Sequence, residues 1–108
     1  MKATYWQRGE TLDYTPENAV ANGEVVSLGT RIGVAGSDIK AGELGHLHVV
    51  GVFEMPKAAS TAIAMGAAVY YDASAGNITT TSSSNVPAGY AAAAAGANDT
   101  TLLVKLLG

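Results

Sequence analysis

Hydrophobic residues alternate with polar ones in short runs along the chain, and glycine, proline, asparagine or aspartate separates the runs. This period of two predicts short β-strands with one buried face. The clearest case begins with Ala67–Tyr71, continues through turn residues at Asp72–Asn77 and returns with Ile78–Thr81. The pattern predicts a β-hairpin in which Gly76 or Asn77 adopts a positive φ.

Within the first strand of this hairpin, Val69 and Tyr71 alternate onto one face and Tyr70 onto the other. An isolated hairpin is marginal in water, so the remaining chain must supply strands that cover the apolar face.

Other runs predict the remaining strands, with turn residues between them. Ile32 and Val34 share one face of their run, and the longest run is expected to bend or bulge at Gly51 and to end at Pro56. The predicted strands are Glu24–Leu28, Arg31–Ala35, Leu44–Glu54, Gly89–Ala93 and Thr100–Leu106.

Two segments have helical character. Lys57–Met65 is long enough for one helical turn but rich in Ser, Thr and Ala. Ala91–Ala95 contains the best helix former, yet Gly89 and Gly96 bound it, and we expect a strand there. The predicted fold is therefore all-β: a small antiparallel β-barrel or sandwich of short strands, with at most a short helical turn.

A short phrase recurs three times: an apolar residue, two spacers, a glycine, one further residue and an apolar residue that opens a strand. The copies are Val20–Val25, Ile39–Leu44 and Ile63–Ala68. Their uneven spacing favours a repeated turn-into-strand device over sequence duplication or a solenoid. We expect the apolar residue to plug the end of the barrel while glycine forms the turn.

The N-terminal segment holds Tyr5, Trp6 and Tyr14 among mostly polar residues. One interpretation places Leu12 and Tyr14 in an edge strand, with Trp6 capping the core. The other describes an arm that becomes ordered on a partner, with Trp6 as its buried anchor. We therefore divide the chain into residues 1–15, an N-terminal arm with the first edge strand, and residues 16–108, a single β-barrel-like domain.

Composition limits the function. The 108 residues allow one modest core, and only 14% of them are charged, against about 25% in typical domains. A surface so short of charge favours assembly with other proteins. The net charge of −3, without a cluster of Lys or Arg, argues against direct nucleic-acid binding. No apolar segment approaches a membrane span or a signal peptide, so we expect a cytosol-made protein without membrane contact.

The motif search gives little support to catalysis. No lysine follows a glycine, which excludes a phosphate loop, and neither GxSxG nor HExxH occurs. His46 and His48 have the spacing of two metal ligands, with Glu43 or Glu54 as a third, but two solvent-facing histidines are the commoner outcome. Asp13, Asp38, Asp72 and Asp99 lie in turn-like contexts, where carboxylates cap backbone N–H groups. We expect no enzyme, cofactor or metal site.

Three phrases resemble a family of small capsid decoration, or cement, proteins of tailed phages. They are Tyr5 with Gly9 and Thr11–Thr15, Gly51–Lys57, and Gly66–Asp72 followed by Gly76–Thr79. The likeness covers nearly the whole chain. Members have sometimes been labelled RecA/RadA recombinases, but this chain lacks the phosphate loop and the length of a recombinase core.

The resemblance implies a β-rich module, made in the host cytoplasm, that docks on the outside of an assembled head and stabilises it by bridging capsomers. It implies the major capsid protein as partner and a homotrimer at threefold positions. We expect Tyr5, Trp6, Arg8 and Tyr14 to contact the capsid or a neighbouring subunit. The alternative function is a virion-displayed module that binds carbohydrate or a host surface through exposed Tyr and Trp.

Overall fold

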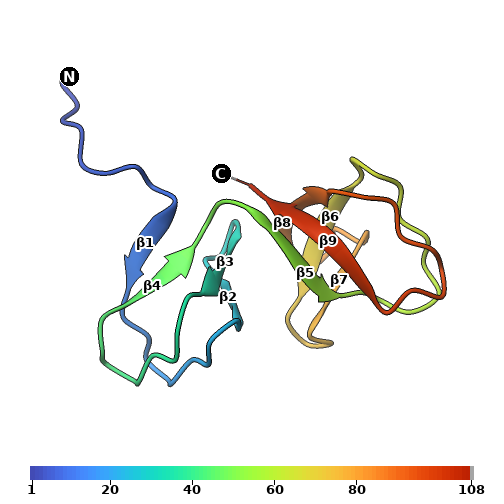
Figure 1. The fold of residues 1–108 in the computed structure, drawn as a ribbon, viewed down its shortest axis with the longest axis horizontal. Coiled ribbons are helices and arrows are strands. Elements are labelled where there is room, and N and C mark those ends of the chain that lie inside the picture. The colour runs from blue at the N-terminus through green and yellow to red at the C-terminus, as the bar shows by residue number, and fades with distance from the viewer. Residues whose placement is uncertain (108) are drawn as a thin grey trace.

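The computed structural model describes residues 1–107, which form two antiparallel β-sheets and no helix (Figure 1). The strands are β1 (Thr11–Tyr14), β2 (Val25–Ser27), β3 (Ile32–Ala35), β4 (Gly45–His48), β5 (Val52–Pro56), β6 (Ala68–Asp72), β7 (Asn77–Thr79), β8 (Val86–Ala91) and β9 (Thr101–Leu106). The first sheet has the order β1-β4-β3-β2 and the second β5-β9-β8-β6-β7. The prediction of an all-β fold is confirmed; the described strands close no barrel, and the sandwich alternative fits.

Strand β3 joins the two sheets because it is buried on both faces. Ile32 and Val34 face the larger core, which the second sheet fills with residues such as Val69 and Val104. Ala35 belongs instead to a smaller core within the first sheet. The shared face predicted for Ile32 and Val34 is thus confirmed. Burial of each large aliphatic side chain contributes about 1.5–3 kcal/mol. Because its residues lie in both cores, β3 links the two cores through one short strand.

The predicted hairpin is confirmed as β6 and β7, with Tyr71 paired to Ile78. Gly76 closes its loop with a φ of +69°, and its N–H donates to the Asp72 carbonyl (2.8 Å). The Asp72 carboxylate accepts further hydrogen bonds from two loop N–H groups. Val69 is buried, and Tyr71 packs against the same core, as the alternation predicts.

The turn-into-strand device is confirmed at all three predicted places. The three glycines have φ values between +76° and +86°: Gly23, Gly42 and Gly66. The three apolar residues are buried, but in open sheets and not at the end of a barrel: Val20, Ile39 and Ile63. Val20 forms a bridge with Ile39, and Ile63 forms one with Ala95. Ala95 marks a fourth copy, in which Asn98 replaces the turn glycine and the Asp99 N–H donates to the Gly96 carbonyl (3.1 Å).

One expected strand is divided. The Leu44–Glu54 run contains all of β4 and the start of β5, which belong to different sheets. Gly51, at a φ of +123°, lies at this crossover. The predicted bend is thus larger than a bulge, because this left-handed backbone conformation lets the chain leave one sheet and enter the other.

The helical turn expected in Lys57–Met65 is wrong. Lys57 bridges Ile78 and Ile63 bridges Ala95, so neighbouring strands capture the backbone hydrogen bonds that a short helix needs. The strand predicted at Gly89–Ala93 is confirmed as far as Ala91, the last residue of β8. Among residues 1–107, no helix has the length and apolar character needed to cross a membrane.

Gly89→Ala is expected to prevent folding or to cost at least about 3 kcal/mol, because a Cβ there would collide with the Lys105 backbone carbonyl and the φ is +148°. Gly76→Ala is the matched control: it meets open space and costs only the left-handed conformation, about 1–2 kcal/mol. Urea unfolding of both variants measures the difference. Equal losses would show that β8 and β9 can separate without penalty.

Val69→Asp is expected to abolish cooperative unfolding, because it buries an unpaired carboxylate in the larger core at a cost of about 4 kcal/mol or more. Tyr70→Ala, on the half-buried opposite face, is expected to cost about 1 kcal/mol. Chemical denaturation monitored by circular dichroism compares them. The reverse ranking would mean that the register of β6 is shifted by one residue.

Candidate functional site

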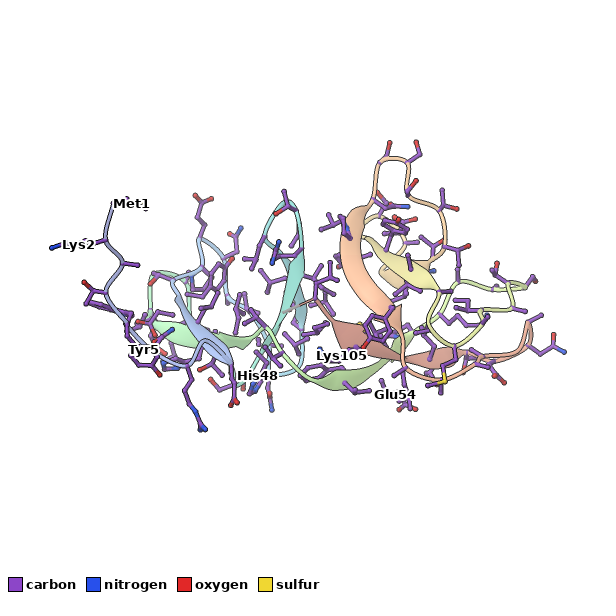
Figure 2. The ribbon with its side chains drawn as sticks, turned by 90° about the horizontal axis from the view of Figure 1, so that it is seen from above. Met1, Lys2, Tyr5, His48, Glu54 and Lys105 are labelled. Carbon is purple, nitrogen blue, oxygen red and sulfur yellow. The ribbon has the colours of Figure 1, made fainter. Side chains whose placement is uncertain are left out.

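Residues 1–9 form an arm that precedes β1 and projects from one end of the molecule, where Figure 2 shows Met1, Lys2 and Tyr5. Trp6 is 88% exposed and Tyr5 80% exposed. The interpretation in which Trp6 caps the core is therefore wrong. Polar residues surround Trp6 in sequence, and both hydrophobic cores close without it.

The arm is basic as well as aromatic. Lys2 and Arg8 lie within it, and the first acidic residue of the chain is Glu10. The Gln7 side-chain amide donates to the Thr11 carbonyl (3.2 Å), which anchors the arm where β1 begins. Tyr5, Trp6 and Arg8 are consequently grouped on one exposed, positively charged segment.

Tyr14, the fourth predicted contact residue, lies apart from this group. It ends β1 and packs, half-buried, against the smaller core that contains Ile39 and Leu47. Its ring therefore has a structural role in holding the edge strand, which leaves only part of its surface for a partner.

A second surface, which the sequence analysis missed, is the outer face of the five-stranded sheet. Val52, Tyr90 and Leu103 are between 41% and 51% exposed. Lys105 pairs with both Val52 and Tyr90 in the strand register, and Glu54 pairs with Leu103. Figure 2 shows Glu54 and Lys105 far from the arm. This outer apolar face contains one basic and one acidic side chain among large apolar ones.

The alternation along β9 was a signal for this face. Leu102, Val104 and Leu106 are buried, so the intervening Leu103 and Lys105 must point outward. An ordinary half-buried strand has polar residues at its outward positions, so the outward leucine at position 103 distinguishes β9 from such a strand.

The two histidines of β4 each have a neighbour within the fold. His46 and His48 lie on the same side of β4, as expected, but His46 Nε2 pairs with Asp13 Oδ1 (3.3 Å), and the half-buried His48 ring lies 6.0 Å from the Phe53 ring. Within residues 1–107, no three potential ligands cluster. Both histidines are therefore engaged in pair contacts within the fold.

Three of the four aspartates cap turns as predicted. Asp38 Oδ1 accepts from the Asn22 N–H (2.8 Å), Asp99 Oδ2 accepts from the Gly96 N–H (2.7 Å), and Asp72 caps its hairpin loop. Asp13 is the exception, because it lies within β1 beside His46. These bonds commit the carboxylates of Asp38, Asp72 and Asp99 to the backbone.

Among the grooves in the surface of the described residues, two lie next to β2 or β3. One, of about 320 Å³, lies between the sheets and is lined by the polar residues Asn22, His48 and Glu54 together with glycine and apolar residues. The other, of about 540 Å³, runs beside β2 and is lined by residues 14–20 and 24–27. The exposed arm, the outer apolar face and the groove beside β2 are surfaces suited to protein contacts.

Comparison with known proteins identifies a family. A family model described as phage cement protein matches residues 6–106. No curated protein and no solved structure matches the chain. The matched residues include both sheets and the part of the arm from Trp6 onward, but not Tyr5.

Trp6 is the only tryptophan, so its fluorescence reports on the arm alone. In the free monomer we expect emission at the wavelength of tryptophan in water and quenching by iodide close to that of free tryptophan, because the side chain is 88% exposed. Unfolding in urea should change both little. In protein dilute enough to be monomeric, a blue-shifted emission that moves on unfolding would place Trp6 in a core.

Proposed function

The chain belongs to the phage cement protein family, and we propose that it binds the outer surface of an assembled phage head and stabilises it by bridging capsomers. The observation that carries this proposal is the family match over residues 6–106, nearly the whole chain. The low charge and the exposed apolar side chains support it, because both favour a protein that covers part of its surface in an assembly.

In the proposed assembly, the partner is the major capsid protein and the cement protein is a homotrimer at threefold positions. It is made in the host cytoplasm and ends on the outside of the virion. Residues 1–15, the arm and first edge strand, carry the contacts with the capsid or a neighbouring subunit, and residues 16–108 are the single β-barrel-like domain that supports them. The position of the arm at one end of the molecule supports this division.

Tyr5, Trp6 and Arg8 are the proposed contact residues of the arm, with Tyr14 contributing the exposed part of its ring. Aromatic and arginine side chains dominate interface hot spots, and truncating one typically costs about 2 kcal/mol or more. A trimer repeats each contact three times, and simultaneous attachment raises avidity well beyond a single contact.

We propose a structural role without catalysis, cofactor or nucleotide. Membership in a family of cement proteins supports this role. Commitment of three aspartates to turn caps and of His46 to Asp13 supports it further, because these groups already have partners within the fold. Saturable ATP binding in calorimetry would contradict it.

Deleting residues 2–8 is expected to leave the folding and the melting temperature of the monomer nearly unchanged, because the arm contributes to neither core. Co-sedimentation with capsids should be lost. Trp6→Ala should weaken retention at least tenfold, the equivalent of about 1.4 kcal/mol, while Thr4→Ala on the same arm serves as the matched control.

Saturation of capsids by the truncated protein at the wild-type concentration would show that the arm is not the contact. Failure of the truncated protein to fold would assign Tyr5 and Trp6 to a core. Retention on a glycan array that is lost with Trp6→Ala, without retention on capsids, would support the alternative carbohydrate-binding function.

A further inference from the structure

The two sheets are built on the same plan. The order β1-β4-β3-β2 in the first sheet matches β5-β9-β8-β6 in the second, and every neighbouring pair in both is antiparallel. The bridge between Val20 and Ile39 joins the β1–β2 connection to the β3–β4 connection. The bridge between Ile63 and Ala95 joins the corresponding connections of the second half.

The backbone hydrogen bonds of the connections repeat as well, at lengths of 2.8–3.1 Å. Most bonds of the first half have a counterpart between equivalent positions of the second half, the exceptions being the Leu28 N–H to the Arg31 carbonyl and the Gly42 N–H to the Pro16 carbonyl. Four such bonds follow, each named from N–H donor to carbonyl acceptor, with the second-half counterpart in parentheses. They are Gly23 to Ala35 (Gly66 to Ala91), Ala35 to Glu24 (Ala91 to Ala67), Gly36 to His46 (Ala92 to Leu103) and Val49 to Glu10 (Leu106 to Gly51). The chain therefore contains one fold twice.

The halves differ at one element, because β7 has no counterpart in the first sheet. In the second half, β7 lies between β6 and the segment that follows β5. It pairs with β6 on one side, and on the other side Ile78 bridges Lys57 and accepts a hydrogen bond from the Ala58 N–H (2.9 Å). Ile78 is 1% exposed, so β7 contributes a core side chain as well as a strand.

The corresponding place in the first half is open. It lies between β2 and the segment that follows β1, and the groove of about 540 Å³ occupies it, lined by residues 14–20 and 24–27. A four-residue hairpin turn connects β2 directly to β3, closed by the Leu28 N–H on the Arg31 carbonyl (2.8 Å). The first half thus has the slot for a fifth strand without a strand of its own to fill it.

We propose that the N-terminal arm of a second copy fills this slot as an added strand beside β2. The Leu28 N–H donates toward β3. Backbone N–H groups of successive residues in an antiparallel strand point to opposite sides, so the N–H groups of Val25 and Ser27 point away from β3, toward the groove. An extended segment with free backbone groups is the partner that such an edge accepts.

The arm fits this slot by charge and by shape. The groove contains the exposed carboxylates of Glu17 and Glu24, while the arm contains Lys2 and Arg8 and no acid. It also supplies Tyr5 and Trp6, either of which provides the apolar side chain that Ile78 provides in the second half.

A second copy fits the slot better than the same chain does. β7 runs antiparallel to β6, and β1 runs antiparallel to β2 through the sheet order. If the arm of the same chain ran through the groove in the direction of β7, it would leave the groove at the end remote from Thr11. The arm has to reach Thr11, however, because β1 begins there. Exchange of arms between copies avoids this reversal, and it goes beyond the proposed function because it requires no capsid.

The chain lacks cysteine, so introduced thiols test this contact directly. Thr4→Cys protein and Ser27→Cys protein are mixed and oxidised, with Gln7→Cys as a second arm position. We expect mixed disulfide dimers at a yield at least tenfold above that of Thr4→Cys mixed with Ser83→Cys, an exposed loop position of the second half. If the arm cysteine at position 4 and the one at position 7 both cross-link to Ser27→Cys with no higher yield than to Ser83→Cys, the proposal is overturned.

Sedimentation of the free protein measures the association itself, so a failure of capsid binding does not affect it. Deleting residues 2–8 should weaken self-association at least tenfold, and Glu17→Lys should weaken it in a salt-dependent way that Arg8→Glu in the same chain partly restores. Unchanged association of the truncated protein would overturn the proposal. So would cross-linking of Ser27→Cys to the capsid protein in assembled heads in place of a second copy.

Discussion

Burial of β3 on both faces is the constraint on which the arrangement of the two sheets depends. A strand of four residues places Ile32 and Val34 in one core and Ala35 in the other, and Gly33 leaves room for the Leu47 side chain, which lies about 3.1 Å from where a Cβ would be. A protein of this size has few other apolar side chains to spare. The second half therefore relies on β3 of the first half to complete the larger core, whereas the smaller core is formed by first-half residues alone.

The local parts of the fold could be predicted from the sequence. The β6–β7 hairpin was predictable because alternation and turn residues lie within a dozen positions of each other. The crossover at Gly51 was not, since the sheet that a strand joins depends on distant residues, and the apolar pattern on either side of Gly51 is the same. The Lys57–Met65 segment was mispredicted for a related reason, because Ile78 and Ala95, far along the chain, determine its hydrogen bonding.

The candidate site shows the same difference: its features that depend on neighbouring residues could be predicted, and those that depend on distant residues could not. Tyr5, Trp6 and Arg8 lie together because they are close in sequence on a segment without apolar neighbours, which the sequence displays. The partial burial of Tyr14 depends on Ile39 and Leu47, and the outer apolar face brings together Val52, Tyr90 and Leu103 from three strands. The repeated plan was hidden as well, because only the turn glycines survive as a sequence signal, and the fourth turn replaces glycine with Asn98.

The attachment of the arm to an edge strand determines how the protein bears mechanical tension. A force on the arm enters the sheet at Thr11, where β1 begins, and β4 is the only strand to which β1 is paired within the described sheet. Pulling along β1 shears its four residue pairs with β4, so their hydrogen bonds, perpendicular to the strand, share the load together. Pulling outward from the sheet would instead peel them apart one after another. In the proposed assembly on a phage head, the protein would therefore resist a stretch along the shell surface best with β1 lying in the plane of that surface.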